Sequence, residues 1–111
     1  MERKRLYVSL PISGRDLDKV KRHAKKVKGI WEERGYDVVT PFEIVEDDNG
    51  EMEPLAYYAY AMGKCVEALL MCDGIVLCKD WFGSNGCRAE CSVAEVYRID
   101  RMIDYTDYEE D

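Results

Sequence analysis

The stretch from Asp73 to Val96 has the residue types of a small-molecule site. Residues 75–78 are an apolar run that predicts a buried strand, residues 79–86 form a polar loop, and Glu90 lies about one turn into the helix that follows. Open α/β sheets bind ligands beyond the carboxyl ends of their strands, where a helix N-terminus favours an anion such as phosphate. We therefore expect Glu90 to face a ligand crevice, although a well-capped βα unit explains the same residues.

The cysteines and the single histidine do not form a metal-binding pattern. Cysteines occur at positions 65, 72, 78, 87 and 91, and the only histidine is His23. Their number is odd and no C-x-x-C pair is present, so neither a disulfide framework nor a zinc site is predicted. We expect reduced cysteines in or near the core of a cytoplasmic protein, with no metal and no organic cofactor.

Composition and charge exclude several classes of protein. The 111 residues are 47% hydrophobic and 35% charged, which is ordinary for one globular domain spanning residues 1–111. The net charge of -7 argues against a nucleic acid polymer as partner, because phosphate neutralisation needs an excess of lysine and arginine. No apolar run approaches the length of a membrane span, so no membrane partner is expected.

Basic residues are concentrated in the first third of the chain. They predict the solvated face of a helix, with His23 exposed on it. The alternative is a surface that steers anionic ligands towards the protein.

The first part of the sequence predicts a βαβ unit. Residues 6–10 and 36–40 have the composition of strands, and Gly35 ends the segment between them. Asp16 or a neighbour can cap a helix there, and apolar residues recur along it at intervals of three and four (Leu17, Val20, Ala24, Val27 and Trp31). Strand, helix and strand with short joins indicate a parallel crossover.

The second part continues the same alternation. Residues 43–53 are acidic and lack an apolar period, so we expect a loop. Pro54 is suited to the first turn of a helix that ends near residue 71. The aromatic and sulfur residues of that helix favour packing or a subunit interface over a cofactor site (Tyr57, Tyr58, Tyr60 and Met62). Residues 101–105 predict a short edge strand, and residues from about 106 to 111 predict a frayed acidic tail.

Three segments resemble one group of proteins. They are the opening Y-V-S-L-P-I-S-G, the helix end C-D-G-I-V-L, and D-W-F-G-S-N-G-C-R-A-E. In this order they resemble the nucleoside 2-deoxyribosyltransferase-like superfamily, and within it the small bacterial and phage family called domain of unknown function 4406. The resemblance covers nearly the whole chain. It implies a three-layer α/β fold, with a Rossmann-like, flavodoxin-type parallel sheet of four to five short strands flanked by helices, and a homodimer or higher homo-oligomer.

The resemblance also implies an activity. Characterised members cleave the N-glycosidic bond of 2'-deoxynucleosides or their 5'-monophosphates, and pass the deoxyribosyl group to another base or to water. By this resemblance Glu90 is the nucleophile at the anomeric carbon, and Tyr7 positions its carboxylate. The implied partner is a small-molecule deoxynucleotide, contacted by the first loop and the strand before it (Ser9, Ile12, Ser13, Gly14 and Arg15).

Ser84 lies six residues before Glu90, at a position that divides the superfamily. The matching serine of the nucleotide hydrolases binds the 5'-phosphate, whereas the transferases have an acidic residue there for the free 5'-hydroxyl. A serine therefore favours a monophosphate, since a carboxylate would repel the dianion. The Ser84 hydroxyl and the N–H groups around Gly86 are the expected phosphate ligands, and a turn with a helix cap is the plainer interpretation.

Cys65 departs from the pattern of the superfamily. Characterised enzymes have an aspartate at this substrate-contacting position, eight residues before Asp73, and it helps to handle the base and protons. A thiol with a reference pKa of about 8.5 is mostly protonated at neutral pH and cannot replace a carboxylate as a charged partner. The absence of this carboxylate is expected to impair turnover and to leave the phosphate site unchanged.

Other roles remain open from the residues alone. Glu90 without the resemblance is an exposed helix residue, and Tyr7 is a core aromatic. The nearby helix N-terminus is expected to favour the ionised form of Glu90. Trp81 has two interpretations, as a residue that stacks on a base or as one that covers the sheet edge. Asp73 is either the polar start of a strand or a residue that shapes the site.

Three functions are compatible with these observations. The leading hypothesis is a cytoplasmic N-glycosidase of 2'-deoxynucleoside 5'-monophosphates, acting by hydrolysis or by deoxyribosyl transfer. The second is a nucleotide-binding or sensing protein that keeps the phosphate site and has lost chemistry through Cys65. The third is a structural protein, in which the Tyr- and Met-rich helix serves assembly.

Overall fold

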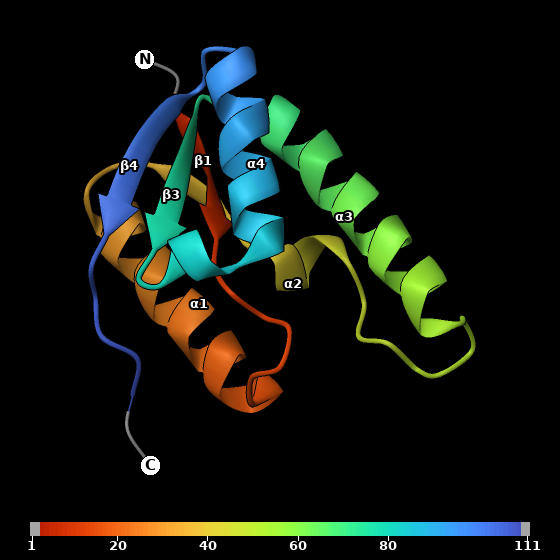
Figure 1. Cartoon of the computed structure of the whole chain (residues 1–111). Helices are drawn as coiled ribbons and strands as arrows, with labels where there is room; N and C mark the ends of the chain where they lie inside the picture. The colour runs from red at the N-terminus through yellow and green to blue at the C-terminus, as the bar shows by residue number, and fades with distance from the viewer. Residues whose placement is uncertain (1–2, 110–111) are drawn as a thin grey trace.

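The computed structural model describes residues 3–109, which form a parallel sheet between two layers of helices (Figure 1). The strands lie in the order β2-β1-β3-β4 and all three pairings are parallel (β1, Arg5–Ser9; β2, Asp37–Val39; β3, Gly74–Cys78; β4, Asp100–Asp104). Parallel neighbours require crossover connections, which the helices supply. The predicted three-layer, flavodoxin-type α/β fold is confirmed, with four strands.

The helices divide between the two faces of the sheet. Helix α1 (Leu17–Glu33) covers one face, and helices α3 (Pro54–Leu70) and α4 (Asn85–Val96) cover the other (Figure 1). Two short elements follow the carboxyl ends of β2 and β3: helix α2 (Pro41–Ile44) and the 3-10 turn η1 (Trp81–Gly83). The site described below lies at this end of the sheet.

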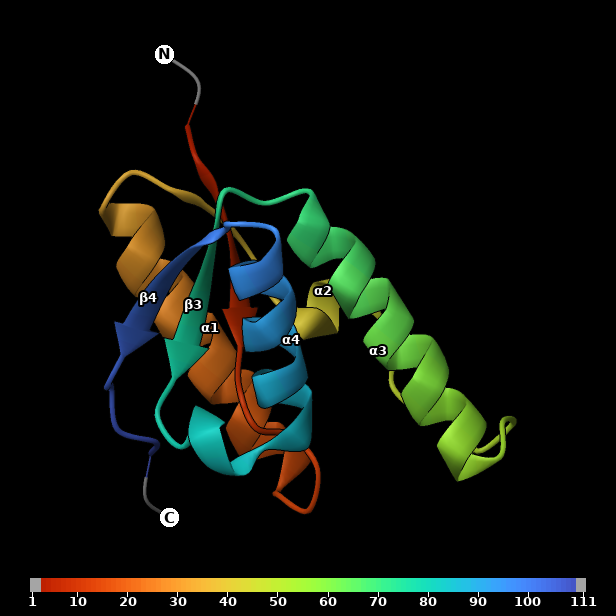
Figure 2. The same ribbon diagram turned by 45° about the horizontal axis from the view of Figure 1, so that its top comes forward.

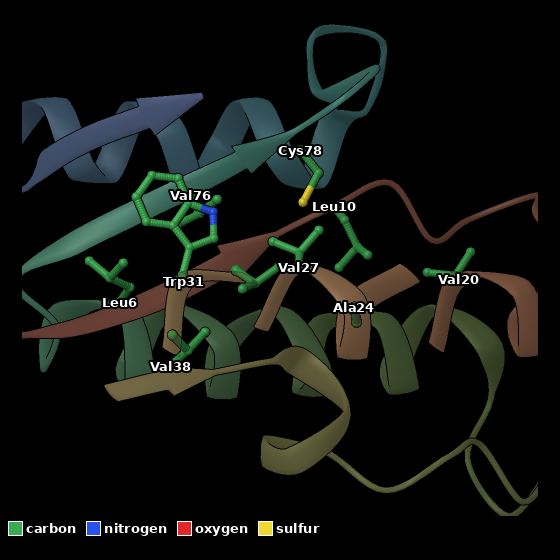
Figure 3. Close-up of a cluster of buried hydrophobic side chains, with 10 residues drawn as sticks. Leu6, Leu10, Val20, Ala24, Val27, Trp31, Val38, Val76 and Cys78 are labelled. Atoms are coloured by element: carbon green, nitrogen blue, oxygen red, sulfur yellow. The ribbon is translucent and has the colours of Figure 1, made fainter. Parts of the chain in front are cut away.

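The two faces of the sheet differ in polarity. Successive side chains of a strand point to opposite faces. The β1 and β3 side chains towards α1 are all apolar, and Figure 3 shows them packed with those of the helix (Leu6, Leu10, Val20, Ala24, Val27, Trp31, Val38, Val76 and Cys78). Tyr7 and Ser9 of β1 point to the other face, where both contact α4. Polar groups of the sheet are thus directed towards α4.

Helix α1 begins and ends as its sequence predicts. The Asp16 carboxylate caps the helix by accepting hydrogen bonds from the N–H groups of Asp18 and Lys19 at 3.0 and 3.3 Å. Gly35 follows the helix with a φ of 99°, a left-handed conformation that glycine adopts without steric cost. The predicted apolar stripe is buried except for Leu17, which is 39% exposed.

His23 is buried, contrary to the expectation that it lies on the exposed basic face. It lies three residues after Val20 and four before Val27, and these spacings place it on the buried side of α1. Tyr108 covers it from the C-terminal segment, with ring centroids 3.8 Å apart and planes at 19°. The sequence did not predict that this segment returns to α1.

Two further segments are more ordered than predicted. Residues 43 and 44 of the expected loop belong to α2, whose start is fixed by Pro41 and by Glu43, which accepts hydrogen bonds from the Thr40 N–H and hydroxyl at 3.1 Å. In the expected frayed tail, Asp107 pairs with Lys79, and Glu109 pairs with Arg22 at 3.2 Å. Opposite charges on separate segments explain the attachment of the tail, of which residues 110–111 lie outside the described part.

Two other findings concern the cysteines and the length of the helices. All five cysteines are free and buried, and burial raises the pKa of the Cys72 thiol to about 11. Of the helices described between residues 3 and 109, none is long and apolar enough to cross a bilayer.

The environment of His23 predicts a loss of stability in mild acid. Neither ring nitrogen has a hydrogen-bond partner among the described residues, and burial lowers the pKa of the imidazole although Asp104 and Glu109 attract its charged form. The unfolded chain then binds the proton more readily than the folded chain. The free energy of unfolding should therefore fall as the pH decreases below about 6.5, the ordinary pKa of histidine.

The variant His23→Phe tests this prediction, since it keeps the ring stack and cannot take up a proton. Its stability should exceed that of the wild type by about 1 kcal/mol at pH 6, because two unpartnered buried nitrogens are removed. The gain should grow towards lower pH. Urea unfolding of both proteins between pH 5 and 8 measures the difference, and parallel pH profiles would contradict the prediction.

Candidate active site

A cavity of about 350 Å³ lies beyond the carboxyl end of β1. Strand order reverses between β1 and β3, and the crevice at such a switch point is the usual ligand site of an open α/β sheet. Most of the lining is apolar, and it comes from β1 and the loop after it, from the region of α2, and from α3 and α4. A pocket of this size and character is suited to a small organic ligand.

Glu90 lies at the wall of this cavity with only 5% of its surface exposed. The Tyr7 hydroxyl donates a hydrogen bond to Oε2 at 2.7 Å, and the Ser9 hydroxyl donates one to Oε1 at 2.7 Å. Both donors are on one face of β1, two residues apart, so a single strand presents two hydroxyls to one carboxylate. The orientation of the carboxylate is thereby fixed.

The direction of the pKa shift of Glu90 differs from the expectation. Burial raises the pKa of this carboxyl, and the hydrogen bonds from Tyr7 and Ser9 oppose the change without overcoming it. We expected the helix N-terminus to favour the ionised form. That influence falls off within the first turn, and Glu90 is the sixth residue of α4. The pKa of Tyr7 is also raised, by burial and by the negative charge of Glu90, which keeps its hydroxyl a hydrogen-bond donor.

A second hollow, of about 590 Å³, adjoins the cavity at the N-terminus of α4. The two share four lining residues (Ser13, Tyr58, Ser84 and Gly86), and the second hollow also includes Arg15. Ser84 caps α4, since its Oγ accepts a hydrogen bond from the Cys87 N–H at 3.3 Å. Free N–H groups at the start of α4, hydroxyls and the Arg15 guanidinium line this hollow and favour an anion, whereas the Asp80 carboxylate beside Arg15 opposes one.

The structure brings most of the predicted site residues together. Seven of them line the cavity (Tyr7, Ile12, Ser13, Cys65, Ser84, Gly86 and Glu90), and Ser9 contacts Glu90 directly. Arg15 lines the adjoining hollow but not the cavity. Gly14, at a φ of 76°, lines neither space and serves the turn between them and α1.

Two other residues considered for the site lie elsewhere. Trp81 lines neither the cavity nor the adjoining hollow, and instead packs on the core under α3 and α4, so the expected stacking on a base has no geometric support. Asp73 lies at the amino end of β3, where its Oδ2 accepts a hydrogen bond from the Arg5 N–H at 2.8 Å. That is the opposite end of the sheet from Glu90.

Cys65 projects from α3 beside the hydroxyl of Tyr7. Burial raises the pKa of its thiol above the ordinary value, and the nearby Glu90 carboxylate acts in the same direction. Cys65 is therefore uncharged at neutral pH, and the position supplies no carboxylate. Within residues 3–109, no group of three or more His, Cys, Asp or Glu side chains could hold a metal ion.

Sequence reasoning missed one wall of the cavity. Phe42, Val45, Asp47 and Asp48 reach it from α2 and the loop after it. Thr40 followed three residues later by Glu43 is a capping-box signature that could have indicated α2. Tyr58 and Met62, which were interpreted as packing or interface residues, also line the cavity.

Comparison with solved structures shows the same fold in two other proteins. The 2-deoxyribosyltransferase from the psychrotolerant bacterium Bacillus psychrosaccharolyticus aligns with a TM-score of 0.67 and 14% identity over 89% of this chain and 70% of that enzyme. A conserved protein from Enterococcus faecalis V583 aligns with a TM-score of 0.64 and 22% identity over 96% of this chain, which spans 65% of that protein. At such identities the likeness establishes the fold alone.

Comparison by sequence gives the family. No curated protein matches the chain at a significant level. A family model described as "Domain of unknown function (DUF4406)" matches residues 4–103, which is nearly the whole chain. The chain therefore belongs to the DUF4406 family, within the nucleoside 2-deoxyribosyltransferase-like fold that its motifs predicted.

Proposed function

We propose that the protein is an N-glycosidase of 2'-deoxynucleoside 5'-monophosphates, with Glu90 as the nucleophile. The observation that carries the proposal is a buried carboxylate, held by Tyr7 and Ser9, at the wall of a cavity that adjoins a polar hollow. The fold that the chain shares with a 2-deoxyribosyltransferase supports it.

The reaction follows from the chemistry of a carboxylate. Glycosidic cleavage passes through an oxocarbenium-like state, which the Glu90 carboxylate captures at the anomeric carbon. The base leaves with the electron pair of the C–N bond and takes up a proton from solvent. Water or a second base then attacks the same carbon, gives up a proton to solvent and displaces the Glu90 carboxylate, which gives hydrolysis or deoxyribosyl transfer.

Tyr7 and Ser9 leave the carboxylate oriented towards the cavity. Each donates to a different oxygen, so rotation of the group is restricted. The apolar surroundings that raise the pKa of Glu90 also remove solvent from the nucleophile. Activity therefore requires a pH above the raised pKa of this carboxyl.

The proposal that the substrate carries a 5'-phosphate is based on the adjoining hollow. Ser13, Ser84 and the N–H groups around Gly86 would contact a 5'-phosphate there, and Arg15 would supply positive charge. The apolar cavity beside Glu90 would take the deoxyribose and the base. A serine at position 84 is compatible with the phosphate dianion, which an acidic residue would repel.

A second candidate function is nucleotide binding without turnover. The observation that favours it is the neutral Cys65 thiol, at the position where the resemblance expects an aspartate that handles the base and protons. Cys65 lies outside the lining of the adjoining hollow, so phosphate binding there would not depend on it.

A homodimer or larger homo-oligomer is proposed as the functional state. The N-terminal half of α3 projects from the body of the fold (Figure 2). Its apolar side chains are exposed, with Leu55 71%, Tyr58 43% and Tyr60 45% accessible. Exposed apolar side chains at this end of the helix suggest an interface, and Tyr58 would connect that interface to the cavity.

The enzymatic proposal predicts release of free base from deoxynucleotides. The assay incubates the protein with a panel of 2'-deoxynucleoside 5'-monophosphates, and with the matching deoxynucleosides, and separates the products by chromatography. Release should be faster from the monophosphates. Ligand-induced thermal stabilisation without any release of base would favour the second candidate function.

Glu90→Gln should abolish base release while retaining the ligand. The rate should fall by a factor of about 10³ or more, because the amide is not a nucleophile. The variant should be at least as stable as the wild type at neutral pH. The folded-state pKa of Glu90 is raised above its ordinary value of 4.5, so ionisation of this group destabilises the fold as pH rises through that range.

Melting curves with and without a deoxynucleotide, recorded beside the activity assay, check both parts of this prediction. Glu95, which lies further along α4 and is exposed, supplies the matched control Glu95→Gln. Equal rates of base release in Glu90→Gln and in the wild type would remove Glu90 from the mechanism.

Removing either hydroxyl donor should shift the acid limb of the activity profile to higher pH. The hydrogen bonds from Tyr7 and Ser9 both lower the pKa of Glu90, so Tyr7→Phe and Ser9→Ala raise it. Hydrogen bonds to charged groups contribute about 1.5–3 kcal/mol, and the expected loss of kcat/KM near neutral pH is about 10-fold or more. Ser9 does not line the cavity, so Ser9→Ala separates this effect from a contact with substrate. An unchanged acid limb in both variants would show that the two hydroxyls do not set the pKa.

A further inference from the structure

Arg15 separates two hollows on the surface. One is the hollow at the N-terminus of α4, and the other, of about 720 Å³, is lined by α1, the loop after β3 and the C-terminal segment. The guanidinium lies 3.6 Å from the Asp80 carboxylate and 5.3 Å from the centre of the Tyr108 ring. At 3.6 Å the ion pair is longer than a hydrogen bond. The aromatic face is therefore the second restraint on Arg15.

Tyr108 is itself held in place from several sides. Its ring stacks on the buried His23 at 3.8 Å, and its hydroxyl donates to the Lys79 carbonyl at 3.4 Å. The neighbouring residues are attached as well, since Asp107 pairs with Lys79 and Glu109 pairs with Arg22. Tyr108 is thus a fixed surface, with one face on His23 and the Arg15 guanidinium near its ring.

We propose that Tyr108 is a positioning residue for the phosphate of the ligand. By restraining Arg15 at the edge of the α4 hollow, the ring keeps a flexible cation where an anion can meet it. Phosphate affinity consequently depends on the C-terminal segment, which lines neither the cavity nor the α4 hollow. The inference rests on the proposed function, because it assumes that this hollow holds the 5'-phosphate.

The competing explanation is that Tyr108 only covers the core at His23. A purely structural residue would affect every ligand of the site in the same way. A positioning residue for Arg15 affects only ligands that carry the phosphate. Comparing a deoxynucleoside 5'-monophosphate with its own deoxynucleoside distinguishes the two explanations.

The experiment measures dissociation constants of such a pair by calorimetry, at fixed pH and salt. Tyr108→Leu keeps an apolar side chain on His23 and removes the aromatic face. It should therefore weaken binding of the monophosphate by about 3- to 10-fold and leave binding of the nucleoside unchanged. Tyr108→Phe should restore the affinity for the monophosphate, since the ring remains. Tyr105, which is 76% exposed, provides the control Tyr105→Leu, which should match the wild type.

Arg15→Ala separates failure of this inference from failure of the proposed function. If Arg15→Ala loses preference for the monophosphate and Tyr108→Leu does not, the positioning role is overturned and the phosphate site stands. If Tyr108→Leu weakens both ligands equally, its role is structural and the inference is again overturned. If the wild type itself does not prefer the monophosphate, the proposed substrate class fails, and the inference fails with it.

Discussion

The candidate site depends on a carboxylate that is removed from water and held by two hydroxyls of one strand. A buried charge is costly unless hydrogen-bond donors replace the lost solvent, and Tyr7 and Ser9 supply one donor to each oxygen of Glu90. This arrangement requires β1 in the interior of the sheet, with the register that points both side chains towards α4. The apolar α1 layer on the other face fixes that register, because a shift by one residue would exchange the two faces.

The region of the cavity combines two environments that suit different parts of one ligand. Beside Glu90 the wall is largely apolar, which raises the pKa of the carboxyl and disfavours water. At the N-terminus of α4, hydroxyls, backbone N–H groups and Arg15 create a polar hollow. A single helix contributes to both, since α4 begins at the cap residue Ser84 and carries Glu90. The proposed nucleophile and the proposed phosphate site are therefore positioned by the same helix.

Basic residues of α1 form ion pairs with acidic residues of the segments that surround the cavity. Lys28 pairs with Glu43 of α2 at 2.7 Å, Lys21 pairs with Asp47 in the loop after it at 2.5 Å, and Arg22 pairs with Glu109 of the C-terminal segment. Each exposed pair contributes little to stability. Together they determine which acidic segments lie against α1, and one of these segments forms a wall of the cavity. The face predicted to be simply solvated thus has partners in the fold.

The sequence by itself determined the alternation along the chain of the four strands with helices α1, α3 and α4, the ends of α1 and the capping role of Ser84, because these depend on periodicity and on neighbours within a few residues. Its motifs also indicated the family and seven of the residues that line the cavity. Only the tertiary structure decided the burial of His23, the raised pKa of Glu90 and the contact of Tyr108 with Arg15. These properties arise between residues far apart in the chain, as with Tyr7 and Glu90 at a separation of 83 positions. Desolvation and long-range contact are properties of the packed molecule, and no local pattern encodes them.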